Sequence, residues 1–400
     1  MDQWRKNVIL LWIAIFIASV CWTMVMPFMP VFLENDLGLS VGVMAWAGLL
    51  GAVNSGFNAL MAPVWGAMGD RFGRKPMMLR AGLALTLAYF LMSLVSDPYQ
   101  LLGVRVMIGV LTGFIPTAIA LVGTTTPQEH VGKALSLVAT ANQSGAILGP
   151  LLGGVLADLI GLRASMVASS ALIALATALV LFAVKEQFTP VQRESGNLLT
   201  DMGEVLRNPS FAAVLVATVI MMASQAAMEP VLVPYIKELL GDEAPNWMAG
   251  AIYSLPGIAF ILAAPWWAHR AERLGYTTTV SLGLFLGAAA ILPQALVSTG
   301  WTMGALRLSA GLALAAVGPG ISALITLVVP RSQRGRAFGL NQSAFAIGAM
   351  LGPLLGGMVG DWAGTAWVFP VTALLLALGG VWTRFVLDPR IRREPVTDLE

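Results

Sequence analysis

Charged side chains are rare within the apolar stretches of this sequence, and two of them are candidates for chemistry. Glu229 follows an apolar run that begins at Phe211, and Arg105 lies in the middle of another run. Burial disfavours the charged form of a carboxyl group and raises its pKa toward neutrality. Glu229 is therefore a candidate for binding and releasing a proton, or for attracting a cation. Arg105 is a candidate for responding to the protonation of a carboxylate, or for binding an anionic group.

A second interpretation of Glu229 stays open. Pro230 and Pro234 follow it closely, and proline ends or bends helices. An early helix end would leave Glu229 as a solvated charge in an outer vestibule.

The elements that carry these residues are apolar enough to cross a membrane. The chain is 57% apolar and 11% charged, against about 25% charged in a typical soluble domain. A spanning helix needs about 20 apolar residues, and continuous apolarity with interspersed glycine favours helices over a β-barrel. The sequence predicts twelve spans, at about 8–33, 43–68, 77–95, 99–123, 133–157, 162–184, 211–236, 247–268, 277–297, 302–328, 338–360 and 365–386.

Basic residues predict the orientation of these spans. Of the 23 Lys and Arg residues, all but Arg105, Arg163, Lys237 and Arg307 fall on the side of the amino terminus. This bias places both termini in the cytoplasm of a cell-membrane protein. The basic groups are then topology signals and lipid contacts, which argues against nucleic acid as a partner.

The chain contains a duplication of its whole length. The decapeptides 145–154 and 348–357 differ at one position and lie 203 residues apart, and Pro63 and Trp65 match Pro265 and Trp267 at an offset of 202. An even number of spans per repeat keeps the repeats parallel, with a central cavity at their interface. We therefore expect an all-α integral membrane fold with six-helix bundles at 1–184 and 211–400, the latter ending in a cytoplasmic tail. A polar cytoplasmic linker is expected at 185–210.

Two sets of residues suggest moving parts. Glycines at four-residue spacing let helices approach closely, and proline invites a bend. The packing set on the fifth and eleventh spans comprises Gly145, Gly149, Pro150, Gly153, Gly154, Gly348, Gly352, Pro353, Gly356 and Gly357. The loop after the second span combines small residues with charges that can hold acidic groups, helix ends or lipid phosphates. Its members are Gly66, Gly69, Asp70, Arg71, Gly73, Arg74 and Lys75.

These motifs resemble the major facilitator superfamily over essentially the whole chain. The loop 66–75 resembles its most specific signature, and Arg105-x3-Gly109-x3-Gly113 resembles its second motif. The run 145–154 resembles a motif of exporters, and Pro27 and Pro30 resemble one of twelve-span drug:proton antiporters. The resemblance implies the major facilitator fold, with the loop around Asp70 as a conformational latch. No carboxylate lies in the middle of the first span, which departs from the best-known drug antiporters.

A polyspecific pocket needs aromatic and flexible apolar walls with a few polar groups. Any of the polar candidates can instead bridge helices. The candidate substrate-binding residues are Trp22, Met26, Asn54, Phe57, Asn58, Phe114, Asn142, Gln143, Gln225, Glu229, Tyr253, Asn341, Gln342 and Phe345.

The favoured function is proton-coupled export of lipophilic, often cationic, small molecules by rocking of the two bundles. Glu229 and Arg105 would couple protons, and a proton would be the coupling ion without any cofactor or metal. No nucleotide-binding or metal-helix motif is present, which argues against an enzyme or ATP-driven pump. A monomer is expected. The alternatives are a narrow-specificity carrier for a sugar, lysolipid or other metabolite, and a membrane scaffold or sensor without transport.

Overall fold

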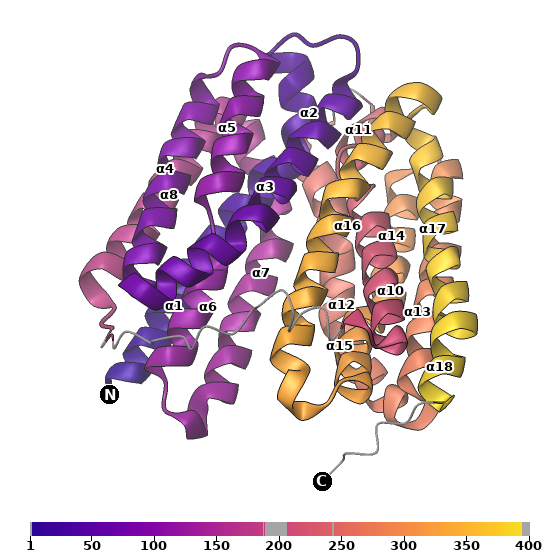
Figure 1. Cartoon of the computed structure of the whole chain (residues 1–400). Coiled ribbons are helices and arrows are strands. Elements are labelled where there is room, and N and C mark those ends of the chain that lie inside the picture. Colours follow the sequence, from indigo (N-terminus) through magenta and orange to yellow (C-terminus); the bar gives the residue numbers. More distant parts are fainter. Residues whose placement is uncertain (1, 187, 189–205, 242–243, 394–400) are drawn as a thin grey trace. The chain divides into compact units, whose positions relative to one another are not determined.

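A computed structural model describes residues 2–186, 188, 206–241 and 244–393, and the regular structure in these residues is entirely helical (Figure 1). Twelve helical segments of the described chain are long and apolar enough to cross a membrane. This confirms the predicted all-α, twelve-span class. The helices form two compact units. Unit 1 contains the described residues of 1–192 and 242–254, and unit 2 contains those of 193–241 and 255–400.

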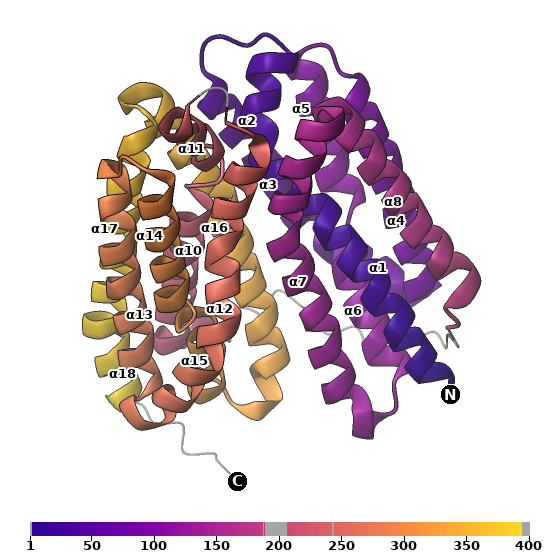
Figure 2. The same ribbon diagram turned by 180° about the vertical axis from the view of Figure 1, so that it is seen from behind.

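Long helices make up unit 1, which Figure 2 shows from behind. The first span continues beyond its α-helix through a 3-10 turn, a short helix and a π-turn, where Pro27 and Pro30 interrupt the regular hydrogen bonding. The helices are α1 (Gln3–Val25), α2 (Met29–Val31), α3 (Val43–Phe72), α4 (Arg74–Leu94), α5 (Pro98–Leu111), α6 (Phe114–Thr125), α7 (Gln128–Ile160) and α8 (Leu162–Ala183).

Unit 2 follows the same order of long and broken helices. The first residues of α12, up to Ser254, are grouped with unit 1, and the remainder belongs to unit 2. The helices are α10 (Pro209–Ala226), α11 (Leu232–Leu240), α12 (Asn246–Leu274), α13 (Tyr276–Ile291), α14 (Gly300–Leu314), α15 (Val317–Val328), α16 (Arg334–Ala363), α17 (Val368–Trp382) and α18 (Asp388–Arg393).

The duplication seen in the sequence recurs as a repeated side-chain contact. The ring N–H of Trp65 on α3 donates to the carbonyl of Val110 on α5 at 2.7 Å. The ring N–H of Trp267 on α12 donates to the carbonyl of Leu312 on α14, also at 2.7 Å. Both residues of the second pair lie 202 positions after those of the first. Each tryptophan therefore joins the second span of its half (α3 or α12) to the first helix of the fourth span (α5 or α14).

The fourth span of each half is broken into two helices. In the first half α5 ends at Leu111 and α6 begins at Phe114, and in the second α14 ends at Leu314 and α15 begins at Val317. Proline lacks an N–H group and clashes with the carbonyl four residues earlier. Pro116 and Pro319 each lie four residues after a break, at Thr112 and Ala315. The predicted spans 99–123 and 302–328 thus each consist of two helices.

The predicted span 211–236 is wrong as a single helix. Helix α10 ends at Ala226, and turns over 227–231 separate it from α11. The sequence Met228-Glu229-Pro230 occupies these turns, which agrees with the early helix end considered for Glu229. Most of the predicted linker 185–210, and residues 394–400 at the end of the predicted cytoplasmic tail, lie outside the described residues.

Candidate functional site

The loop between α3 and α4 is a tight turn centred on Gly73. Gly73 has φ of +100°, in the left-handed region that side chains rarely adopt. The guanidinium of Arg74, the first residue of α4, folds back and pairs with the carboxylate of Asp70 on α3. A Cβ atom at Gly69 would lie 2.8 Å from Nη1 of Arg74, so glycine there makes room for this pair. The turn explains the glycine at Gly73, and the ion pair explains why Gly69, Asp70 and Arg74 occur together.

A carboxylate near the end of unit 1 in the sequence, which the sequence analysis did not identify, binds this loop. Glu186, just after α8, accepts hydrogen bonds from the backbone N–H groups of Arg74 and Lys75, each at 2.8 Å. The ammonium of Lys75 donates in return to the carbonyls of Leu181 and Val184, at 2.8 and 2.7 Å. Each helix end thus receives a charge that complements its dipole.

Unit 2 holds a related carboxylate at the matching place. Asp388 lies 202 positions after Glu186, and its Oδ1 accepts from the hydroxyl of Thr277 near the start of α13 at 2.5 Å. Its Oδ2 accepts from Arg384 at 3.2 Å. In both halves a carboxylate at the end of the sixth span therefore binds the start of the third. The shared offset was a signal available in the sequence.

Two members of the loop motif differ from expectation. A Cβ atom at Gly66 would meet nothing within 4 Å, so close packing does not explain this glycine. The guanidinium of Arg71 lies over the ring of Phe72, 5.1 Å from its centroid.

The glycine-rich faces of the fifth and eleventh spans pack closely on the first helix of their own halves. A Cβ atom at Gly145 would lie 2.6 Å from Cβ of Ser19 on α1, and one at Gly348 would lie 2.7 Å from Cβ of Met222 on α10. Gly149 and Gly153 also face α1, Gly352 also faces α10, and Gly356 faces Ala227, which directly follows α10. Gly357, Pro150 and Pro353 are buried, and both prolines lie inside continuous helices.

Gly154 faces the start of α12, within the part of that helix grouped with unit 1. Its Cβ would lie 2.7 Å from Cα of Trp247. One turn further along α7, the carboxylate of Asp158 accepts from the backbone N–H groups of Asn246 and Trp247, at 2.8 and 2.9 Å. Asp158 therefore caps the first turn of α12 in the manner of an N-cap side chain.

Arg105 is deeply buried on α5. Its side chain is 1% exposed, and its Nε and Nη2 have no hydrogen-bond partner in the part of the chain that the structure describes. Burying a charge without a partner is costly, and such a residue within a membrane span is a functional candidate.

Glu229 lies in the turns between α10 and α11 and is half-buried. Its backbone N–H donates to the carbonyl of Ala226 at 3.1 Å. Its carboxylate has no ion pair or hydrogen bond with any residue that the structure describes. The neighbouring Met228 accepts a weak contact from Nη1 of Arg307 at 3.9 Å, and Arg307 is buried to 9% exposure.

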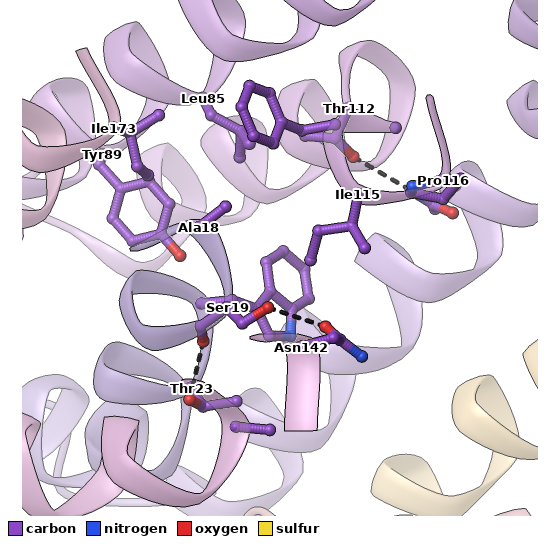
Figure 3. Close-up of a pocket in the computed structure, with 15 residues that line it drawn as sticks. Ala18, Ser19, Thr23, Leu85, Tyr89, Thr112, Ile115, Pro116, Asn142 and Ile173 are labelled. Carbon is purple, nitrogen blue, oxygen red and sulfur yellow. Dashed lines mark hydrogen bonds between the residues drawn. The ribbon is translucent and has the colours of Figure 1, made fainter. Parts of the chain in front are cut away.

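A cavity of about 380 Å³ in unit 1 contains four of the predicted substrate-binding residues, Trp22, Asn58, Phe114 and Asn142 (Figure 3). The break between α5 and α6 forms part of its wall, held by a 3.0 Å hydrogen bond from Asn58 to the hydroxyl of Thr112. The complete lining is Ala18, Ser19, Trp22, Thr23, Asn58, Leu85, Tyr89, Thr112, Gly113, Phe114, Ile115, Pro116, Asn142, Ala146 and Ile173.

The other predicted substrate residues do not line this cavity. The backbone of Asn54 and the side chain of Phe57 pack against Gly109, where a Cβ atom would lie 2.8 Å from each. Asn341 accepts from Thr218 at 2.7 Å and bridges α16 to α10. Met26 lies in the 3-10 turn after α1, and Tyr253 is half-buried on α12. The exposed remainder is Gln143, Gln225, Gln342 and Phe345.

Comparison with known proteins decides the family. A sequence model described as Major Facilitator Superfamily matches residues 11–248 and 214–400. The chain belongs to the major facilitator superfamily. Its two overlapping matches agree with the duplication. The chain is therefore a multi-pass membrane transporter and not an enzyme, as the motifs predicted.

Relatives and solved structures of this superfamily resemble the chain over nearly its whole length. It is 34% identical to "Multidrug resistance protein MdtG" of Serratia proteamaculans, over 98% of this chain and 96% of the relative. It is also 34% identical to the protein of that name from Enterobacter lignolyticus, over 95% and 92%. A bacterial homologue of the human lysosomal transporter Spinster has a TM-score of 0.84 at 15% identity, covering 100% and 99%. A peptide transporter POT has a TM-score of 0.79 at 15% identity, covering 97% and 95%.

Proposed function

We propose that this transporter exports lipophilic small molecules from the cytoplasm in exchange for protons. The observation that carries the proposal is Glu229, a half-buried carboxylate at a helix interruption without an ionic partner in the described structure. A carboxylate in such a place can bind a proton or the cationic part of a substrate, and competition between the two links their movements. The names of the relatives support substrates of the multidrug type.

Arg105 is the second part of the proposed coupling. Its guanidinium is buried and incompletely hydrogen-bonded, so few neighbouring groups stabilise its positive charge. The energy of this charge is therefore sensitive to any change of charge nearby. Protonation of an acidic group therefore changes the electrostatic energy of the span that carries Arg105. The affinity for substrate and the affinity for protons change together, which is the requirement for linked transport.

The moving parts in this proposal are the loop around Gly73 and the glycine-rich helices. The pair of Asp70 and Arg74 acts as a latch that forms in one state and opens in another. Helices α7 and α16, which pack closely on α1 and α10, transmit the rearrangement as the two halves rock. The bias of basic residues supports cytoplasmic termini, and lipids and small substrates are the partners of a monomeric protein.

Transport in proteoliposomes tests this proposal. Purified protein is reconstituted, a pH gradient is imposed, and the flux of a fluorescent lipophilic cation is followed with and without a protonophore. Export predicts that the dye moves opposite to the proton gradient and that the protonophore abolishes this movement. Dye flux that ignores the gradient would contradict proton coupling, and the absence of dye flux would favour a narrow-specificity carrier.

A further inference from the structure

The cavity in unit 1 is polar but carries no charge of its own. Among the residues that line it, all of which the structure describes, none has a side chain that is charged at neutral pH. The aromatic rings of Trp22, Tyr89 and Phe114 can pack on apolar rings as well as on cations, but a binding wall for cations normally also contains a carboxylate. The polar groups here are instead hydroxyls, amides and one indole N–H, which recognise uncharged oxygen and nitrogen atoms.

Each of the two amides in the cavity forms one hydrogen bond to a neighbouring hydroxyl group. Oδ1 of Asn142 accepts from the hydroxyl of Ser19 at 2.8 Å, so its Nδ2 is left as a donor (Figure 3). Nδ2 of Asn58 donates to the hydroxyl of Thr112 at 3.0 Å, so its Oδ1 is left as an acceptor. As the structure orients the two amides, the cavity presents a free donor on α7 and a free acceptor on α3.

The surroundings of the cavity disfavour a positive charge. The guanidinium of Arg80 donates to the carbonyl of Thr112, a residue that lines the cavity, at 3.3 Å. The phenol hydroxyl of Tyr89 donates to the carbonyl of Cys21 at 3.2 Å, so it adds no negative group. The positive charge of Arg80 beside this wall would repel a cation in the cavity.

We propose that this cavity binds the uncharged, amide- or hydroxyl-bearing part of a substrate. A carbonyl oxygen of the substrate accepts from Nδ2 of Asn142, and an N–H or O–H group donates to Oδ1 of Asn58. An adjoining apolar ring packs on Trp22 and Phe114. This inference rests on the proposed export function and specifies its substrates as neutral aromatic amides or alcohols, in addition to the cations that Glu229 would attract.

Binding of two probes to the purified full-length protein tests this assignment. Equilibrium dialysis is performed with radiolabelled chloramphenicol, a neutral aromatic amide with hydroxyl groups, and with tetraphenylphosphonium, a permanent cation without hydrogen-bonding groups. Asn142→Leu and Asn58→Leu are each expected to weaken chloramphenicol binding about tenfold, as the loss of one buried hydrogen bond implies. Binding of the cation is expected to change less than twofold. Ser136→Leu, on the exposed face of the same helix α7, is the control and leaves both affinities unchanged.

A charge substitution keeps the test decisive if a leucine variant folds poorly. Asn142→Asp has nearly the same shape and can still accept from Ser19, yet it adds a carboxylate to the cavity. It is expected to shift the ratio of the two affinities at least tenfold toward the cation at pH 8. An unchanged ratio overturns the assignment, as does equal loss of both probes in the leucine variants. Wild-type protein that binds the cation but not chloramphenicol refutes this inference alone. Failure of proton-driven flux with either probe refutes the export function.

Discussion

The carboxylate of Glu186 lies at the first turn of α4, where its Oε1 accepts from the backbone N–H of Arg74 at 2.8 Å. Its second oxygen accepts from Lys75 at the same distance. A carboxylate that caps a helix in this way satisfies amide groups that the helix leaves unpaired and complements its dipole. Because Glu186 follows α8, this contact joins the end of the sixth span to the loop that contains Asp70 and Gly73.

Removal of this cap is expected to destabilise unit 1. Glu186→Ala should lower the free energy of unfolding by about 1–2 kcal/mol, as for other caps and charge-assisted bonds, and Glu186→Gln should lose less. Thermal unfolding of the purified protein in detergent measures the order of the variants. Glu34→Gln, an exposed carboxylate, is the control. Equal melting temperatures for Glu186→Ala and the control would show that the cap contributes nothing.

Neutralising Asp70 is expected to affect rate more than affinity. Asp70→Asn weakens the pair with Arg74 and so changes the energy difference between conformations, without touching the cavity in unit 1. The turnover rate should fall about tenfold or more, while the substrate concentration for half-maximal rate changes less than twofold. Initial rates in proteoliposomes over a range of substrate concentrations measure both. A loss confined to affinity would refute the latch.

Two glycines on α7 should respond in opposite directions to the same substitution. In Gly149→Ala the new Cβ would lie 2.8 Å from the carbonyl oxygen of Val20, so α1 and α7 must separate, at a cost of about 1–3 kcal/mol. In Gly132→Ala the Cβ meets nothing within 4 Å, and alanine should stabilise the helix by about 0.5–1 kcal/mol. The melting temperature should fall in Gly149→Ala and rise in Gly132→Ala. A change in the same direction in both variants would contradict this packing.

Arg105 is expected to cost stability and to support transport. Its buried guanidinium lacks partners for Nε and Nη2 in the described structure. An apolar side chain of similar length avoids the energetic cost of burying these unpaired groups. Arg105→Met should therefore melt at the same or a higher temperature than wild type. The same variant should lose accumulation driven by a pH gradient. A well-folded variant that retains full coupled transport would remove Arg105 from the mechanism.

The repeat in the sequence predicted much of the internal structure of each half. Matching positions such as Trp65 and Trp267 make the same hydrogen bond, because local packing follows local sequence. For the same reason, Gly145 and Gly348 make equivalent close contacts with the first helix of their own halves. Helix breaks were less visible, since apolarity continues through them. Pro116 and Pro319, at matching positions, were the signal, because each excludes a regular helix four residues earlier.

The site was less predictable than the fold. Four candidate residues line one cavity because they fall on the inward faces of α1, α3, α6 and α7, while Gln143, which directly follows Asn142, is exposed. A shift of one residue rotates a side chain by about 100° around a helix, so the sequence alone does not assign the face. Glu186 was missed because its partners, Arg74 and Lys75, lie more than 100 residues away.

The most direct test of the account is whether substrate movement drives protons through a process that needs Glu229. Proteoliposomes carrying a pH-sensitive dye are loaded with substrate, without an imposed pH gradient, and diluted into substrate-free buffer. Wild-type protein is expected to move protons inward as substrate leaves, and Glu229→Gln is expected to release substrate without moving protons. Proton movement that persists unchanged in Glu229→Gln would contradict the role of this carboxylate. Substrate efflux from wild type without any proton movement would contradict exchange itself.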